Sequence, residues 1–187
     1  MSLRITFDLS DTDLNHFRGV MRRAIKAHKE TDDATIIRAA SNLLSQVNAK
    51  KAPNFITDRL ARLRGLIDMV GDEGWAMPAA DRKRVMSALA YFSDPEDLIP
   101  DEIPGLGFLD DAIMIELAVR ELQHEIEAYR DFCVYRSAEA AHRGIKESEL
   151  AREDFVINRR KRLHGRIKSR RAKRTRNGGS MGNFKLF

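Results

Sequence analysis

Apolar residues recur every three or four positions in several successive segments of this chain, which is the spacing of a helix buried along one face. Within residues 54–71 the steps are four, three, four and three residues, at Ile56, Leu60, Leu63, Ile67 and Val70. Only residues 3–9 alternate with the period of two that is typical of a strand, and one strand cannot form a sheet. We therefore predict an all-α fold of five or six helices, with residues 1–9 as an extended lead-in.

Proline interrupts the helical pattern near the middle of the chain. Three of the five prolines fall within ten residues, at Pro95, Pro100 and Pro104. Each proline lacks a backbone N–H and disfavours helical geometry at the preceding residue, so a continuous helix is impossible here. We expect a compact helix–loop–helix, the proline-rich staple, that apolar residues attach to the core and aspartates cap. The structural residues of this staple are Pro95, Asp97, Pro100, Asp101, Pro104, Gly107, Asp110 and Asp111.

The staple also resembles a known signature. Residues 93–111 read Ser-x-Pro-x-Asp-Leu-Ile-Pro-Asp-x-Ile-Pro-x-x-Gly-x-x-Asp-Asp, which is similar to the YkvA-like family of small helical domains. The resemblance centres on residues 91–111, extends over about residues 85–130, and implies a helical domain without an established activity. Several family members look membrane-associated because this block is more apolar in them. Asp94, Glu96 and Glu102 make it more polar here, which argues against insertion because a carboxylate in lipid is costly.

Charge is distributed unevenly along the chain. Residues 159–187 hold 12 of the 33 Lys and Arg residues and none of the 28 Asp and Glu residues. Residues 1–158 therefore carry 21 basic and 28 acidic side chains. We expect an acidic helical domain over residues 1–158, followed by a basic, mobile extension over residues 159–187. Sign asymmetry of this kind is typical of a chain that binds a polyanion.

The basic character is strongest in residues 159–176, where 11 of 18 side chains are Lys or Arg and most are Arg. The guanidinium fork makes paired hydrogen bonds to phosphate, and arginine-rich segments can order on nucleic acid. We predict contact with nucleic acid or a ribonucleoprotein, without sequence specificity because aromatic residues and a recognition helix are missing. The plainer interpretation is a solvated tail. The predicted binding residues are Arg159, Arg160, Lys161, Arg162, Arg166, Lys168, Arg170, Arg171, Lys173, Arg174 and Arg176.

Two other functions remain open from the sequence. In the first, the same arginines bind an anionic membrane surface, where electrostatic attraction to the lipid headgroups contributes about 1 kcal/mol of binding free energy for each residue. In the second, the carboxylates of the staple make a metal-binding protein or an enzyme, although helix capping explains these aspartates without a ligand. The pairs Glu121/His124 and Glu139/His142 have the spacing of di-iron bundles. However, 18 residues of one helix would hold them about 27 Å apart.

No nucleophile motif, phosphate loop or acid–base pair is evident, so we predict a non-enzymatic adaptor with no metal and no cofactor. The single Cys133 excludes an internal disulfide and fits a reducing, cytoplasmic compartment. A protein partner is expected at the acidic domain or at the apolar end formed by Phe184, Leu186 and Phe187, which loosely resembles peptides that dock on bacterial sliding clamps. The apolar seam from Ile115 to Cys133 would serve a homodimer as well as an internal core.

Overall fold

The chain folds into eight α-helices and one short 3₁₀ helix over the residues that the structure describes. The computed structural model describes residues 8–46, 53–93, 108–150 and 154–176, and within these ranges there is no strand. The helices are α1 (Asp11–Ala27), α2 (Asp33–Gln46), α3 (Asn54–Gly71), α4 (Ala79–Leu89), η1 (Ala90–Ser93), α5 (Leu109–Glu121), α6 (Gln123–Arg143), α7 (Glu147–Leu150) and α8 (Asp154–Arg176). The predicted all-α class is confirmed, but five or six helices were too few.

The ends of several helices follow directly from local sequence. Ser10 caps α1 in a capping box, since its hydroxyl accepts from the N–H of Asp13 and the Asp13 carboxylate accepts from the N–H of Ser10 at 2.9 Å. Asp32 accepts from the N–H of Thr35 in the first turn of α2 at 2.9 Å. Gly144 ends α6 with φ of 65°, a left-handed geometry that glycine adopts with little strain.

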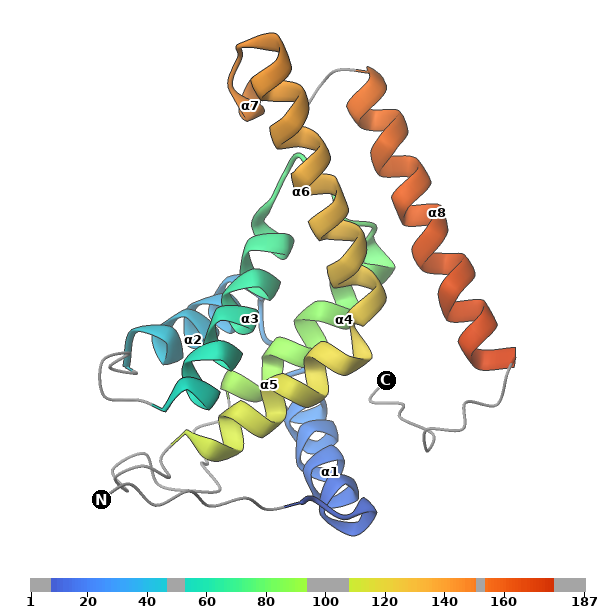
Figure 1. Cartoon of the computed structure of the whole chain (residues 1–187). Helices are drawn as coiled ribbons and strands as arrows, with labels where there is room; N and C mark the ends of the chain where they lie inside the picture. The colour runs from blue at the N-terminus through green and yellow to red at the C-terminus, as the bar shows by residue number, and fades with distance from the viewer. Residues whose placement is uncertain (1–7, 47–52, 94–107, 151–153, 177–187) are drawn as a thin grey trace.

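One apolar core takes residues from every helix from α1 to α8, and its centre lies among α1 to α5, where α4 and η1 contact α1 and α2 (Figure 1). Met21 of α1, Leu63 of α3, Leu89 of α4 and Met114 of α5 are all completely or almost completely buried there. Beside this core, α6 runs upward in the view and α8 returns antiparallel to it (Figure 1). The structure thus places the arginine-rich helix along one flank of the molecule.

The apolar seam predicted from Ile115 to Cys133 does not lie on one continuous helix. Leu122, with φ of −95° and ψ of 14°, separates α5 from α6. Beyond this break, the fully buried apolar residues of α6 are Ala128, Phe132 and Ala140, whereas Ile126, Tyr129 and Cys133 of the predicted seam are half-buried. The break lets α6 present Phe132 to Trp75, whose ring centroids lie 5.2 Å apart. Ile115 and Leu122 are buried within this chain, so that part of the seam is internal core.

The predicted boundary between residues 158 and 159 falls inside α8. The expectation of a mobile extension is therefore wrong for residues 159–176, which form a helix packed along α6. The physical reason is a short apolar seam within the basic segment, because Leu163 and Ile167 are buried against the rest of the chain. The predicted docking residues Phe184, Leu186 and Phe187 lie outside the described residues.

Most of the proline-rich staple also lies outside the described residues, namely Pro95, Asp97, Pro100, Asp101, Pro104 and Gly107. The two staple residues that the structure describes, Asp110 and Asp111, are buried in the first turn of α5. Carboxylates at this position interact favourably with the positive end of the helix dipole. Phe108, with φ of 65°, precedes the helix and supplies no side-chain cap.

Candidate nucleic-acid interface

The cations predicted to bind nucleic acid all lie on α8, and a short seam determines which of them face the protein. Val156, Leu163 and Ile167 follow one another at helical spacings of seven and four residues and are all buried. Through this seam α8 packs beside α6 (Figure 1). Side chains on the seam side of α8 consequently meet the protein, and those on the opposite side meet solvent.

An aromatic cluster fixes the middle of α8. Trp75, in the turn between α3 and α4, is 1% exposed, and its ring centroid lies 4.4 Å from that of His164 on α8. Burial lowers the pKa of His164, and nearby cations add to this effect while Asp81 opposes it. The uncharged imidazole is therefore the form that the packed helix favours.

Two arginines near the exposed edge of α8 pair with acidic residues of α6. Arg166 contacts Asp131 and, one turn later, Arg170 contacts Glu127. All four side chains are between 34% and 55% exposed. Ion pairs in such surroundings contribute only about 0–1 kcal/mol each, because water and salt screen them. These pairs therefore fix the register between α6 and α8 more than they hold the helices together.

Further along α8, two arginines enter a buried charge network. Its acidic members come from α4, α5 and α6, and none of them is more than 7% exposed. The distances from the guanidinium groups of α4 and α8 to these carboxylates are 3.2–3.5 Å, and Arg171 lies closer than this to Asp81. The members are Asp81, Glu121, Glu125, Arg84, Arg171 and Arg174. Because a buried carboxylate without a counter-ion is strongly destabilising, α8 completes the electrostatics of the core.

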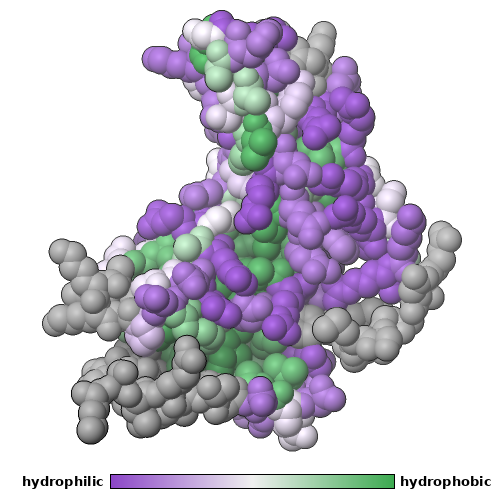
Figure 2. Space-filling view, viewed as in Figure 1, coloured by the Kyte–Doolittle hydropathy of each residue, from purple (hydrophilic) through white to green (hydrophobic). Residues whose placement is uncertain are grey.

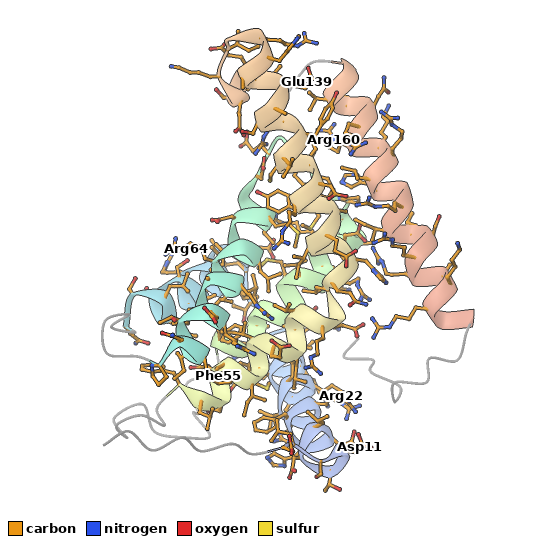
Figure 3. All side chains as sticks on the ribbon, viewed as in Figure 1. Asp11, Arg22, Phe55, Arg64, Glu139 and Arg160 are labelled. Atoms are coloured by element: carbon orange, nitrogen blue, oxygen red, sulfur yellow. The ribbon has the colours of Figure 1, made fainter. Side chains whose placement is uncertain are left out.

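Two more arginines near the start of α8 also face inward. Arg160 donates from Nη1 to the backbone oxygen of Gly74 at 3.0 Å, and it lies between α8 and α6 in Figure 3. The guanidinium of Arg159 lies 5.3 Å from the ring centroid of Tyr135 on α6. Six predicted binding residues thus make contacts within the chain: Arg159, Arg160, Arg166, Arg170, Arg171 and Arg174.

The other predicted cations point away from the protein. Four of them are exposed, and among the described residues no acidic side chain pairs with them: Lys161, Arg162, Lys168 and Lys173. We call this set the outer face of α8. Figure 2 shows a hydrophilic surface where α8 lies. Arg176 ends the helix, and its side chain lies outside the described residues.

Arginine and lysine are thus sorted between the two sides of α8. Six of the seven arginines whose side chains are described face the protein, whereas all three lysines are on the outer face. The planar guanidinium is less strongly hydrated than an ammonium and suits part-buried carboxylates. The sequence analysis interpreted the excess of arginine over lysine in α8 as a preference for phosphate. For the six arginines that contact the protein, ion pairs and hydrogen bonds inside the chain explain this excess instead.

A sequence signal for this arrangement exists in the partner helices. Glu121 and Glu125 are four residues apart and flank the apolar Leu122, so they belong on a buried side of the chain. A buried carboxylate needs a cation, and the richest source of cations in the sequence is residues 159–176. Combining these two observations would have predicted that α8 packs back on α6.

A further ionic cluster holds the other end of α6. Arg136 contacts Asp72 at 2.8 Å and Glu147 at 2.9 Å, and the Tyr129 hydroxyl donates to Asp72 at 3.0 Å. Burial would raise the pKa of Asp72, but the hydrogen bonds and charge of Arg136 hold it below its ordinary value. Burial also raises the pKa of the nearby Cys133, which keeps its thiol protonated and poorly nucleophilic. This cluster joins α3, α6 and α7 and offers no reactive group.

The described residues give no support to the metal interpretation. No group of three His, Cys, Asp or Glu side chains in this part of the chain is arranged to hold a metal ion. Of the two Glu-x-x-His pairs, Glu121 belongs to the buried charge network and Glu139 pairs with Arg143 on α6. His124 is half-buried, and desolvation lowers its pKa. Within the same residues, no helix has the length and hydropathy needed to cross a membrane.

One comparison with known proteins gives a match. Residues 82–117 match the family described as "Protein of unknown function (DUF1232)". This segment runs from α4 through η1 into α5, and so includes the centre of the core. Comparisons with curated proteins and with solved structures gave no match. The YkvA-like resemblance is confirmed for residues 82–117, which are similar to this family of unknown function and form part of a longer helical chain.

Proposed function

We propose that this chain is a non-enzymatic helical adaptor that contacts nucleic acid or a ribonucleoprotein through the outer face of α8. The observation that supports it is the set of four exposed cations, Lys161, Arg162, Lys168 and Lys173, without acidic partners among the described residues. They are spread over roughly 18 Å of helix, a length over which duplex DNA carries several phosphates. Arg159, Arg160, Arg171 and Arg174 make contacts on the inner side of α8, and Arg166 and Arg170 at its edge are paired with acidic residues of α6.

The contact is expected to be weak and independent of sequence. The four cations are spread across the solvent-facing side of α8 and can reach phosphates, but the outer face has no aromatic residue to stack on a base. Releasing the counter-ions of about four phosphates gives a slope of log K against log salt of roughly −3.6 on duplex DNA and −2.8 on a single strand. Engagement of all eleven predicted cations would give a slope of roughly −10 on duplex DNA.

The test is equilibrium binding of fluorescent RNA and duplex DNA across 50–200 mM salt. The variant carries four substitutions on the outer face of α8: Lys161→Gln, Arg162→Gln, Lys168→Gln and Lys173→Gln. A matched control removes the same charge from exposed cations elsewhere: Arg23→Gln, Arg38→Gln, Arg64→Gln and Lys146→Gln. We expect the first variant to lose binding and its salt dependence, and the control to keep both.

Other outcomes identify other functions. Anionic vesicles that compete with RNA for the same four side chains would favour a membrane surface. Equal weakening in both variants would mean that only net charge matters, and the proposed interface would be rejected. Absence of binding at the lowest salt would direct the search to protein partners of the acidic helices. We propose the cytoplasm as the compartment, because the chain carries a single cysteine and nucleic-acid contact is expected there.

A further inference from the structure

A cavity of about 520 Å³ lies on a different part of the molecule, between the end of α1, the start of α2 and the exposed side of α4. Its inner wall is apolar and includes Ile25, Ile36 and Met86. Charged side chains stand around its opening. The cavity shares no lining residue with α8, so a ligand here would bind independently of the proposed nucleic-acid contact.

The charges around this cavity are nearly all positive. Of the fourteen described residues that line it, Asp33 is the one acidic residue, and it pairs with Arg82 at 2.8 Å. Arg82 also donates to the backbone oxygen of Val70 at 2.9 Å, so this pair is fully engaged. Four further cations remain, all exposed and without an acidic partner among the described residues: Arg22, Lys26, Lys29 and Lys83.

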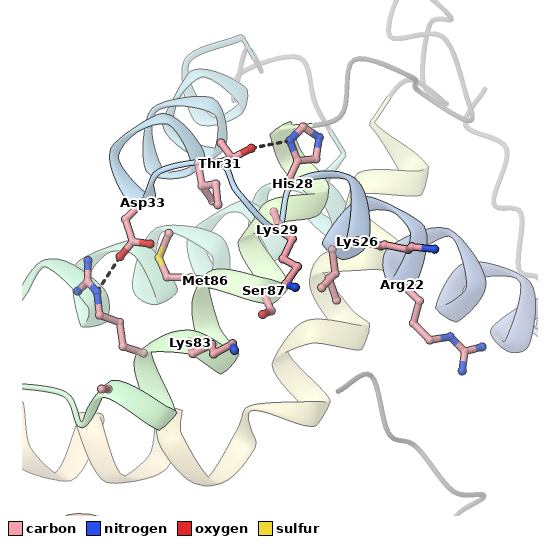
Figure 4. A pocket seen from close by; sticks show the side chains of 14 residues that line it. Arg22, Lys26, His28, Lys29, Thr31, Asp33, Lys83, Met86 and Ser87 are labelled. Carbon is pink, nitrogen blue, oxygen red and sulfur yellow. Dashed lines mark hydrogen bonds and ion pairs between the residues drawn. The ribbon is translucent and has the colours of Figure 1, made fainter.

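Two of these cations lie on α1 and a third follows it. Arg22 and Lys26 are four residues apart on α1, the spacing at which like charges on a helix repel one another, and Lys29 lies in the turn after the helix ends at Ala27. In the close-up, the Lys29 side chain extends from the turn after α1 toward Ser87 of α4, and Lys83 lies further along α4 (Figure 4). The opening of the cavity is therefore a site of concentrated positive charge, which a bound anion would relieve.

The helix dipole accounts for only part of this arrangement. Lys26 lies in the last turn of α1, where a cation is favourable. Lys83 is the fifth residue of α4 and lies beyond its first turn, so the dipole of α4 does not explain its position. The first turn of α4 has no side-chain cap, and Ala79 of this turn lines the cavity. An anion at the opening would interact favourably with Lys83 and with the positive end of the dipole of α4.

We propose that this cavity binds a small phosphorylated organic molecule, of the size and charge of a nucleoside di- or triphosphate. The phosphates would lie at the opening near Lys29 and Lys83, and Arg22 and Lys26 of α1 bring the number of cations there to four, which matches a ligand with several negative charges. The organic part would pack on the apolar wall formed by Ile25, Ile36 and Met86. The cavity volume is in the range of small-molecule sites and too small for a protein segment of any length.

The test is calorimetric titration of the full chain with ATP and with inorganic tripolyphosphate, both without Mg²⁺. We expect ATP to bind more tightly than tripolyphosphate, because only ATP can fill the apolar wall. The double variant Lys29→Gln/Lys83→Gln should weaken both by roughly tenfold or more for each cation lost, the effect of one charge-assisted hydrogen bond. Both side chains are exposed, so the variant should fold, and circular dichroism checks this.

A matched control distinguishes the cavity from general attraction to positive charge. Lys161→Gln/Lys168→Gln removes two exposed lysines from α8 and should leave ATP binding unchanged. Equal weakening by the control, or no binding at millimolar ATP, would overturn the proposal. Equal affinity for ATP and tripolyphosphate would overturn the organic part of the assignment. Binding to phosphatidic acid vesicles through Lys29 and Lys83, without binding of either free probe, would assign the cavity to a lipid headgroup instead.

Discussion

Truncation of one side chain tests whether α8 is part of the folded core. Ile167 is 1% exposed in the seam between α8 and the rest of the chain. Ile167→Ala removes three carbon atoms, which at about 0.8 kcal/mol each gives roughly 2.4 kcal/mol from lost burial alone. The cavity left behind adds to this, so we expect the free energy of unfolding to fall by about 2–4 kcal/mol. A solvated extension would instead tolerate the change within about 0.5 kcal/mol.

The chain supplies a convenient reporter for this measurement. Trp75 is the single tryptophan and packs against His164 of α8, so its fluorescence follows the docking of that helix. Urea unfolding would be followed by Trp75 fluorescence and, in parallel, by far-ultraviolet circular dichroism. Ile145→Ala serves as the control, because Ile145 is 39% exposed and its truncation should cost less than about 1 kcal/mol. Equal midpoints for Ile167→Ala and the unmodified chain would refute the packing of α8.

Three further predictions concern the same helix and its connection to α6. Arg171→Met leaves the buried Asp81 without this counter-ion and should lower the free energy of unfolding, measured by urea titration, by about 3 kcal/mol. The double variant Arg171→Met/Asp81→Asn should recover much of this lost stability, because the unpaired buried charge is removed. Burial holds the pKa of His164 below its value in the unfolded chain, so protonation favours unfolding. Stability should therefore fall as the pH drops below about 6.5, and less so in His164→Gln. Gly144→Ala forces alanine into φ of 65° and should cost about 1 kcal/mol by thermal unfolding.

The sequence predicted the elements whose stability depends on their own apolar pattern. Of the stripe predicted for α3, Ile56, Leu60, Leu63 and Val70 are buried, because one helix face supplies most of its contribution to the core. Ile67 is half-buried, and the stripe omitted the buried Leu66 and Met69. Caps such as Ser10 and Gly144 are signals of the same kind, since they act over one turn of chain. Local signals of this kind need no knowledge of the tertiary structure.

What the sequence did not predict depends on contacts between distant segments. The break at Leu122 changes no local pattern, because apolar residues continue at helical spacing on both sides of it. Its cause is tertiary, since Phe132 packs on Trp75 and Glu125 contacts Arg84, 41 residues earlier in the chain. The candidate interface was located on the correct segment, but which side of α8 faces solvent follows only from the position of α6.

Packing of α8 changes what its charge implies about function. Net charge alone makes residues 159–176 look like a strong polyanion-binding arm, yet six of its arginines already make contacts inside the chain. A polyanion could engage the four most inward of these, Arg159, Arg160, Arg171 and Arg174, only by displacing α8. Displacement would expose Leu163 and Ile167 and leave Asp81, Glu121 and Glu125 with one arginine between them. These costs favour binding to the packed helix through the outer face alone. The salt dependence of binding distinguishes the two modes. A slope of log K against log salt near −4 on duplex DNA means about four phosphate contacts, which the outer face supplies. A slope near −10 means that all eleven cations contact phosphate, which requires α8 to leave α6.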